Sequence, residues 1–457
     1  MEFAILAVFI IGYLAIAFEH NIHVDKAATA LLTGVLCWAI LVVGANAIPP
    51  HLLGDYNALL VLENKNELAL SEFFDHRLLE HLQEIAGILL FLMGAMTIVE
   101  IVDAHEGFRI ITDRIQSTSK VRLLWVITIL TFFLSAALDN LTTAIVMVSL
   151  TRKLVADQKT RWFFGGLIVI AANAGGAWSP IGDVTTTMLW IGKQITSASI
   201  MKEVFLASLF NLLAPLIVLS FVLKGKVERP NRSEDHALTI SASERFTAFA
   251  LGVGGLLFVP VFKGLTHLPP FMGIMFSLGV VWFATELMHG KKTEAQKSKF
   301  SALYALRKID MPSVLFFLGI LLAVAALQEV GHLKTMAIAL RDQLGNVYSI
   351  NIAIGLLSAV IDNVPLVAAS MNMYEISAAA TGDAWTDSFV QDGTFWHFLA
   401  YCAGTGGSIL IIGSAAGVAV MGLEKISFMW YLRNISLWAL IGYIAGALVF
   451  IAEKTLF

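Results

Sequence analysis

The sequence has little charge for its length. Charged residues make up 14% of its 457 residues and hydrophobic residues 58%, whereas a soluble protein carries about 25% charged residues. A larger soluble core does not account for this deficit, because the surface also grows with chain length. A wholly soluble protein is therefore excluded, and lipid is predicted to solvate much of the chain.

Cysteine is also scarce, and the N-terminus lacks the features of a cleaved signal. Cys37 and Cys402 are the two cysteines, and both lie in apolar runs, which argues against a disulfide or a metal site. The start of the chain has neither a basic segment nor a small-residue cleavage site, so it predicts a retained first helix. We expect no resident cofactor and no nucleic acid partner.

Apolar runs that could cross a bilayer recur along the chain. A crossing helix needs about 20 predominantly apolar residues. The clear candidates are residues 2–18, 27–44, 85–103, 204–223, 246–262, 270–288, 312–328 and 430–451. Two further runs, 162–192 and 394–423, contain the glycine-rich segments Ala174–Gly182 and Gly404–Gly407. Because glycine and proline destabilise helix interiors by about 1 and 3 kcal/mol, both runs are predicted to be broken helices.

Two other apolar regions, 121–153 and 346–376, are each divided by an Asp-Asn pair. Basic residues flank the first region on both sides. Since Lys and Arg mark the cytoplasmic side of a membrane, this region is predicted to enter and leave on one side, as a re-entrant hairpin.

The basic residues also set a topology. Of the 30 Lys and Arg residues, 19 fall in the loops 104–122, 151–161, 224–245 and 289–311. If these loops are cytoplasmic and the hairpins do not cross, the chain makes about ten crossings, with both termini on the opposite face.

An internal duplication relates the two halves. Residues 135–141, Ser-Ala-Ala-Leu-Asp-Asn-Leu, match residues 358–364, Ser-Ala-Val-Ile-Asp-Asn-Val, at an offset of 223. Further along, Ala172–Gly176 aligns with Ala403–Gly407. An odd number of crossings in each half would place the second half upside down, and inverted repeats with broken helices are typical of secondary transporters. The predicted organisation is a first repeat at 1–223, a cytoplasmic linker at 224–245 and a second, inverted repeat at 246–457.

Asp139, Asp183 and Asp362 lie inside the predicted membrane-embedded segments. A charged side chain at the bilayer centre costs at least about 2.5–3.5 kcal/mol on insertion scales, so it is usually retained for function. A purely structural interpretation is also available, because Asp and Asn are good helix caps. The symmetric placement of the two Asp-Asn pairs favours function, and capping is compatible with ion binding.

Oxygen-bearing side chains that suit Na⁺ gather in these segments. The predicted cation and proton site comprises Asp139, Asn140, Asn173, Asp183, Thr185, Thr186, Asp362, Asn363, Thr405 and Ser408, supported by Ser135, Thr142, Ser179, Ser358, Ser414 and Glu100. The expected sodium ligands among them are Asp139, Asn140, Asn173, Asp183, Asp362 and Asn363. Burial raises the pKa of a carboxyl group, so one carboxylate can hold either a proton or a cation. We expect a transport site with no catalytic residue.

The two halves are not equivalent. Ser414 stands in the second half where Asp183 stands in the first, so we expect Asp139 and Asp183 to dominate coordination and Asp362 to act as partner or proton carrier. No Lys or Arg lies in the central parts of these segments, which favours a cation over a di- or tricarboxylate as substrate.

Three features outside the centre have plainer interpretations. Glu100 belongs either to an interfacial charge cluster or to a cytoplasmic proton funnel or pH sensor. The pattern from Leu68 to Leu79 predicts an amphipathic helix on the outer surface. His81 is expected to be solvated.

Several of these motifs closely resemble the NhaD family of bacterial sodium/proton antiporters. They are residues 93–100, 135–143, 173–186 and 404–417, and the resemblance spans roughly residues 85–425. It implies the fold of the ion transporter superfamily, with paired hairpins and broken helices, usually as a homodimer. It also implies Li⁺ as a second substrate, a role in pH homeostasis at alkaline pH, and the bacterial inner (cytoplasmic) membrane as the location.

Other functions remain open at this point. An arsenite or sodium-coupled organic anion carrier of the same superfamily would have neutral hairpin tips in place of the Asp-Asn pairs. An intramembrane aspartyl protease could use Asp183 and a second buried Asp, but the chain lacks a Tyr-Asp partner motif. A passive channel would conduct cations without coupling to protons.

Overall fold

A computed structural model describes residues 2–17, 22, 24–44, 70–112, 115, 117–230, 240–290, 300–360 and 362–456. Every named regular element in these ranges is a helix. Eight of them are long and apolar enough to cross a membrane: α3 (Lys26–Val43), α5 (Leu70–Ala104), α7 (Lys120–Leu138), α11 (Ser197–Val222), α12 (Ala242–Thr266), α13 (Pro270–His289), α16 (Met311–Glu329) and α24 (Ser436–Leu456). The predicted all-α, multi-pass membrane class is confirmed.

The other described helices are mostly shorter, and they surround the interruptions in the long apolar runs. They are α1 (Glu2–Ala17), α6 (Arg109–Thr112), α8 (Asn140–Leu154), α9 (Gln158–Ala177), α10 (Val184–Ile191), α15 (Ala302–Leu306), α17 (His332–Leu344), α18 (Val347–Leu357), α19 (Asn363–Met373), α20 (Ala384–Asp387), α21 (Thr394–Gly406), α22 (Ala415–Glu424) and α23 (Phe428–Asn434). The predicted span 430–451 is two helices, because the chain leaves α23 at Ile435 before α24 begins.

The chain folds into two compact units. One contains the described parts of residues 1–90, 310–345 and 368–375, and the other contains those of 91–309, 346–367 and 376–457. Each unit draws segments from both predicted repeats. Residues 231–239 of the predicted linker lie outside the described residues.

The smaller unit is built on the close packing of α3 against α16, with α1 beside α3. Gly34 allows this approach, since a Cβ there would lie 2.5 Å from the carbonyl oxygen of Gly319. The indole Nε1 of Trp38 donates a 2.9 Å hydrogen bond to the carbonyl oxygen of Leu322. Small residues at a helix crossing, with a polar group satisfied across it, are typical of membrane helix packing.

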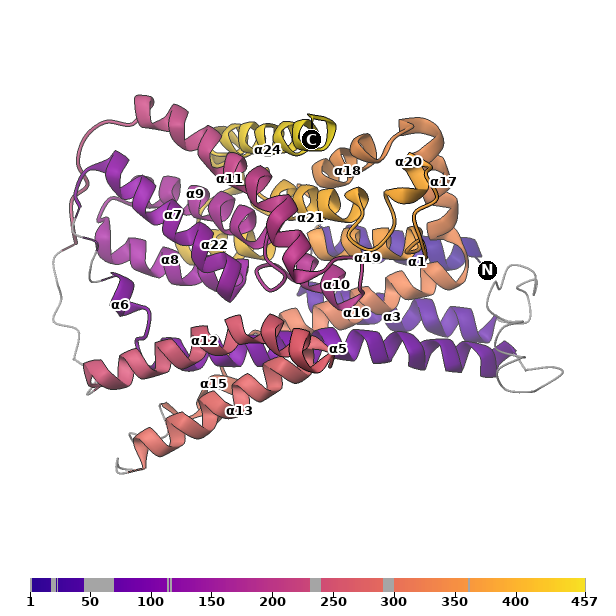
Figure 1. Cartoon of the computed structure of the whole chain (residues 1–457), viewed down its shortest axis with the longest axis horizontal. Coiled ribbons are helices and arrows are strands. Elements are labelled where there is room, and N and C mark those ends of the chain that lie inside the picture. Colours follow the sequence, from indigo (N-terminus) through magenta and orange to yellow (C-terminus); the bar gives the residue numbers. More distant parts are fainter. Residues whose placement is uncertain are drawn as a thin grey trace. The chain divides into compact units, whose positions relative to one another are not determined.

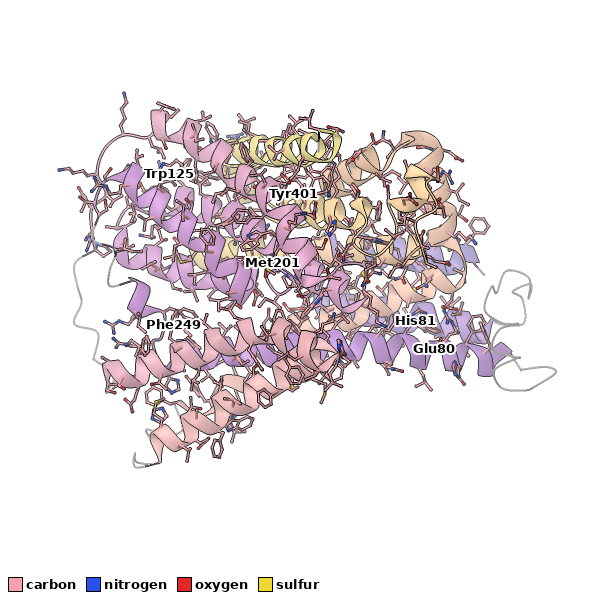
Figure 2. All side chains as sticks on the ribbon, viewed as in Figure 1. Glu80, His81, Trp125, Met201, Phe249 and Tyr401 are labelled. Carbon is pink, nitrogen blue, oxygen red and sulfur yellow. The ribbon has the colours of Figure 1, made fainter. Side chains whose placement is uncertain are left out.

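The N-terminal half of α5 corrects two expectations. The described part of the predicted surface helix is continuous with the predicted span 85–103, because α5 runs unbroken from Leu70 to Ala104. Phe73 and Phe74 are buried, and residues 45–69 lie outside the described residues. His81 (Figure 2) is not solvated: its Nε2 lies 2.8 Å from Oε1 of Glu329, which also accepts from Arg77. A charged pattern predicted water contact, but here the charges neutralise one another inside the unit.

In the larger unit the helices are interrupted at four places. α7 gives way to α8 at Asp139, α18 to α19 between Ser358 and Asp362, α9 to α10 between Trp178 and Asp183, and α21 to α22 between Gly407 and Ser414. Both α7 and α8 pack on α9, and α18 packs on α21 (Figure 1). Buried apolar side chains of α7, α8, α9, α11 and α22 form the surrounding core.

The same hydrogen bond occurs in both sets of interrupted helices. Ser135 Oγ donates to the carbonyl oxygen of Ala172 at 2.6 Å, and Ser358 Oγ donates to that of Ala403 at 2.8 Å. These residues correspond in the sequence duplication. The first bond connects the end of α7 to the last turns of α9, and the second connects the end of α18 to the last turns of α21.

Glycine permits the same close approach in both sets. A Cβ at Gly175 would lie 2.1 Å from the carbonyl oxygen of Phe132, and one at Gly406 would lie 2.0 Å from that of Gly355. Any larger residue would push the interrupted helix away from its neighbour. The glycines predicted to break the helices therefore also bring polar backbone segments together.

Candidate functional site

Asp139 begins α8 in a backbone conformation that few side chains adopt. Its φ is 81° and its ψ is 159°, a region occupied almost entirely by glycine and costing other residues about 1–3 kcal/mol. The carboxylate caps α8, accepting from the backbone N–H of Thr142 at 2.9 Å and from its hydroxyl at 2.7 Å. A glycine would relieve the strain, so the retained carboxylate points to a chemical requirement at this position.

Asp183 caps the second half of the first broken helix. Its side chain is 2% exposed. Oδ1 accepts from the backbone N–H and the hydroxyl of Thr185, both at 2.9 Å, and Oδ2 accepts from Nδ2 of Asn140 at 2.5 Å. The α10 N-terminus, with its partial positive charge, further favours a negative group here. The break between α9 and α10 thus creates the helix N-terminus at which the Asp183 carboxylate is held.

Two buried amides connect the interrupted helices. Asn140 Nδ2 donates to Asn173 Oδ1 at 3.1 Å as well as to Asp183. Asn173 Nδ2 in turn donates to the hydroxyls of Ser408 and Ser414, both at 2.9 Å. Predicted site residues of both halves therefore form one hydrogen-bonded cluster, which we call the Asn173 cluster.

The second Asp-Asn pair lies at the start of α19. Asp362 accepts from the backbone N–H of Val364 at 3.2 Å. Asn363 is 3% exposed, and its Nδ2 has no hydrogen-bond partner within the described part of the chain. A buried amide without a partner is costly, so this N–H donor is available to a water oxygen or another hydrogen-bond acceptor.

The remaining predicted hydroxyls donate to backbone carbonyls. Thr405 Oγ1 donates to Tyr401 at 2.6 Å, Thr186 Oγ1 to Asp183 at 2.9 Å, and Ser179 Oγ to Ala136 at 2.5 Å. With their hydrogens engaged in this way, their oxygens present lone pairs, which are the part of a hydroxyl that a cation binds.

The electrostatics of the cluster are negative. Asp139 and Asp362 are both close enough to Asp183 for their charges to repel its charge. Among the described residues, no three His, Cys, Asp or Glu side chains gather closely enough to hold a metal ion. A cation here would therefore depend on one or two carboxylates together with hydroxyl, amide and carbonyl oxygens.

Glu100 takes part in a different contact. Its carboxylate pairs with Lys308 Nζ at 3.2 Å, and both side chains are partly exposed. No described hydrogen bond joins Glu100 to the Asn173 cluster.

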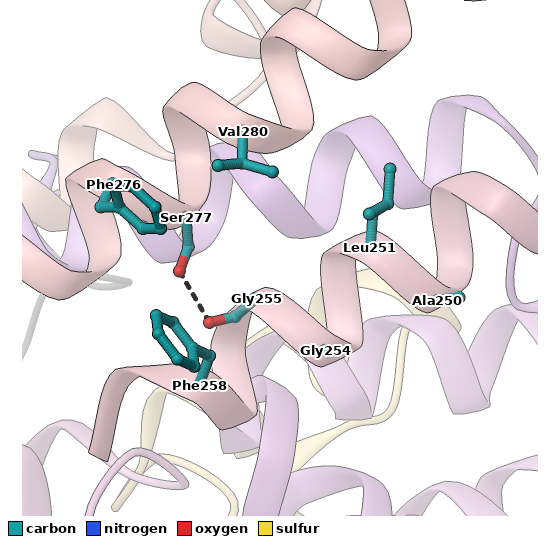
Figure 3. Close-up of a pocket in the computed structure, with 8 residues that line it drawn as sticks. All are labelled: Ala250, Leu251, Gly254, Gly255, Phe258, Phe276, Ser277 and Val280. Atoms are coloured by element: carbon teal, nitrogen blue, oxygen red, sulfur yellow. Dashed lines mark hydrogen bonds between the residues drawn. The ribbon is translucent and has the colours of Figure 1, made fainter. Parts of the chain in front are cut away.

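One described hollow is also separate from the candidate site. It holds about 270 Å³ between α12 and α13, where Ser277 Oγ donates to the carbonyl oxygen of Gly255 at 2.8 Å (Figure 3). Its walls contain no acidic or basic side chain.

Two supports of the site were not predicted from the sequence. Tyr431 donates from its hydroxyl to the carbonyl oxygen of Ser408 at 2.8 Å. Tyr401, inside α21 (Figure 2), donates to the carbonyl oxygen of Tyr443 at 2.8 Å and accepts from Asn211. Both are fully buried tyrosines, and a polar tip in an apolar run was the available signal, since a buried phenol needs a partner.

Glu424 was also not predicted from the sequence, because its partners are distant in the chain. It is 5% exposed and forms ion pairs with Arg152 Nε at 2.5 Å and Arg161 Nε at 3.2 Å. It is the first charged residue after a long uncharged run, which could have identified it. The pairs tie the end of α22 to α8 and α9.

The fold and the site together define a class of protein. A multi-pass helical membrane protein whose interrupted helices hold buried carboxylates and amides is a secondary transporter. Residues 6–389 match the citrate transporter family. The chain is 46% identical to "Sodium/proton antiporter 1" of Arabidopsis thaliana, over 100% of this chain and 73% of that relative. It is 31% identical to "Na(+)/H(+) antiporter NhaD" of Alkalimonas amylolytica, over 98% of this chain and 89% of the relative. The chain belongs to the NhaD-type sodium/proton antiporter family, and it is a transporter rather than an enzyme.

Proposed function

We propose that this protein exchanges Na⁺ for H⁺ across its membrane by alternating access. The carrying observation is the buried Asp183 carboxylate, hydrogen-bonded to Asn140 and placed near two further carboxylates. Its relatives named as sodium/proton antiporters support this reading of the cluster.

The proposed chemistry is competition at a shared set of oxygens. With a proton bound, an aspartic acid is neutral, so protonation removes one buried negative charge, as binding of one Na⁺ does. With Na⁺ bound, the cation neutralises one of the two negative charges of Asp139 and Asp183, and the oxygens of Asn173, Thr185 and Ser408 complete its shell. Asp362 and Asn363 contribute from the second half. A site that has released both its cation and its proton carries uncompensated negative charge, which is unfavourable in the membrane. The transport of Na⁺ in one direction is therefore coupled to the transport of H⁺ in the other.

The movement itself is proposed to use two inverted halves with re-entrant hairpins. The matched bonds Ser135 to Ala172 and Ser358 to Ala403 support a common origin of the halves. α7 has 19 residues, or about 28 Å at 1.5 Å per residue, so its length alone would permit a crossing. The hairpin proposal therefore depends on the basic residues at both of its ends.

A sodium-coupled organic anion carrier is the second candidate, and the match to the citrate transporter family favours it. Carboxylates of a substrate would need positive charge in the site. The negative field at Asp183 favours cation exchange instead.

Finer properties follow as part of the same proposal. Li⁺ is a second substrate, because it also binds hard oxygen ligands. The functional protein is a homodimer, and its membrane maintains a proton gradient, as the bacterial inner membrane does. Relatives from both bacteria and Arabidopsis thaliana leave more than one such membrane as its location.

The direct test is proton flux in sealed vesicles that contain the purified protein. An acid-interior gradient, followed with a pH-sensitive dye, is challenged in turn with Na⁺, Li⁺, K⁺ and citrate. We expect Na⁺ and Li⁺ to dissipate the gradient. A response to citrate that requires Na⁺, with none to Na⁺ alone, would establish the anion carrier instead.

A further inference from the structure

A second described hollow lies inside the larger unit, and no residue of the Asn173 cluster lines it. It holds about 250 Å³, and its walls include Lys120, Lys159, Phe163, Leu223, Trp430 and Asn434. These residues come from the start of α7, the first turns of α9, the end of α11 and α23. None of them belongs to the proposed transport site.

Two lysines bring positive charge to the lining of this hollow. Lys120 is the first residue of α7 and Lys159 lies in the first turn of α9, so two helix N-termini add partial positive charge to two ammonium groups. Ser119, which precedes α7, makes no side-chain capping bond.

One nearby carboxylate offsets part of this charge. Asp157 accepts from the backbone N–H of Thr160 at 2.7 Å. That bond and the charges of Lys120 and Lys159 lower the pKa of Asp157, so it is ionised at neutral pH. Two lysines against one aspartate leave a net positive site. Arg161 does not add to it, because it pairs with Glu424.

The other walls of this hollow are largely apolar and aromatic. Phe164 is buried, and Phe163 and Trp430 are partly buried. The Trp430 ring stands edge-on to Trp162, with ring centroids 5.3 Å apart. Tryptophan is enriched where a membrane meets water, and the basic flanks of α7 and α8 predict the cytoplasmic side. A small soluble anion needs no such wall, whereas a phospholipid presents both a phosphate and acyl chains.

We propose that this hollow binds an anionic phospholipid, with its phosphate between Lys120 and Lys159 and the upper part of its acyl chains against Phe163, Leu223 and Trp430. Basic pockets between helices on the cytoplasmic side are suited to acidic headgroups. The bound lipid would join the starts of α7 and α9 to the end of α11 and so stabilise the larger unit.

Thermal unfolding of the full chain in detergent tests this proposal. Phosphatidylglycerol, phosphatidylcholine or soluble glycerol phosphate is added to the wild type, to the double variant Lys120→Gln/Lys159→Gln, and to Lys120→Arg/Lys159→Arg. Lys334→Gln, an exposed lysine on α17, is the matched control. We expect phosphatidylglycerol alone to raise the Tm by at least about 3 °C, which mass action allows for a ligand well above its Kd. The charge-removing double variant should lose most of this shift, and the arginine variant and the control should keep it.

Several outcomes would overturn the proposal. An equal shift with phosphatidylcholine would remove the role of charge, and an equal shift with glycerol phosphate would make the hollow a site for soluble anions. An undiminished shift in the Lys120→Gln/Lys159→Gln variant would place the lipid elsewhere. If that variant does not fold, Lys159→Gln is compared with the wild type for phosphatidylglycerol retained in native mass spectrometry. Unchanged retention would then contradict the proposal.

Discussion

Asn173 on α9 donates a 2.9 Å hydrogen bond from Nδ2 to Oγ of Ser414, the residue that caps α22. The two residues are 241 positions apart in the chain. Because the same Asn173 amide also accepts from Asn140, the first Asp-Asn pair is connected to the broken helix of the second half. These bonds form a continuous hydrogen-bonded connection between the two broken helices.

Replacing Asn173 should disconnect the two halves. Asn173→Ala leaves Asn140, Ser408 and Ser414 each without one buried partner, so we expect it to destabilise the protein by about 2–4 kcal/mol and to abolish sodium-driven proton flux. Unfolding in mixed detergent micelles measures the first effect. Asn372→Ala is the matched control, since Asn372 makes one 2.9 Å bond to the carbonyl oxygen of Ala368. An Asn173→Ala variant no less stable than this control would contradict the connection.

The paired serine bonds predict equal effects. Ser135→Ala and Ser358→Ala should each lower the free energy of unfolding by about 1 kcal/mol, because each removes one buried bond to a backbone carbonyl. The double variant should show the sum, as the two bonds share no partner. Chemical unfolding of the three variants provides the measurement. A large loss in one single variant and none in the other would argue against structural equivalence of the halves.

The Glu424 ion pairs predict a larger loss. Glu424→Gln removes a buried carboxylate whose partners, Arg152 and Arg161, are 44% and 21% exposed. Complete burial of both partners would suggest about 3–5 kcal/mol, and solvent screening at the arginines reduces our expectation to about 1–3 kcal/mol. Arg152→Gln should cost less, because Arg161 still pairs with Glu424. Equal stability of Glu424→Gln and the wild type would show that these pairs contribute nothing.

Asp392 predicts a dependence of stability on pH. Burial raises the pKa of Asp392, but its contact with His397 and its hydrogen bonds from Thr196 outweigh burial and leave the pKa below its ordinary value. A lowered carboxyl pKa contributes stability above the unfolded pKa of about 3.9, and the contribution is lost as pH falls through the folded pKa.

The variant Asp392→Asn isolates this contribution. The wild type should be more stable than Asp392→Asn at pH 7, and the difference should shrink as the pH is lowered below about 4. Thermal unfolding of both proteins across this range gives the answer. A difference that stays constant or grows toward low pH would contradict the assigned direction.

Much of the architecture could be predicted from the sequence, because the determinants are local. Apolar length defines the long helices, and glycine-rich or Asp-Asn segments coincide with the four interruptions. Asp139, Asp183 and Asn173 could be selected because polar side chains in apolar segments are costly. The bonds of Ser135 and Ser358 occur at equivalent positions, because the duplication aligns Ser135 with Ser358 and Ala172 with Ala403.

The remaining features depend on partners distant in the chain. No local pattern shows that Asn173 reaches Ser408 and Ser414, or that Asp139 adopts a φ of 81°. His81 was expected to be solvated because it lies just before the predicted span 85–103, whereas it is buried against Glu329. In the sequence, the members of a buried ion pair cannot be distinguished from exposed charged residues, because their partners are not known.

The central claim is that the Asp139 and Asp183 carboxylates carry the exchanged cation and proton. Its most direct test is sodium-driven proton flux in vesicles containing wild type, Asp139→Asn or Asp183→Asn, with protein amounts matched. Asn keeps the side-chain shape but not the charge. Asp25→Asn is the control, since Asp25 is an exposed cap of α3 that accepts from Ala27 and Asn caps equally well. We predict flux at the level of empty vesicles for both site variants and wild-type flux for the control. Wild-type flux in both Asp139→Asn and Asp183→Asn would contradict the account.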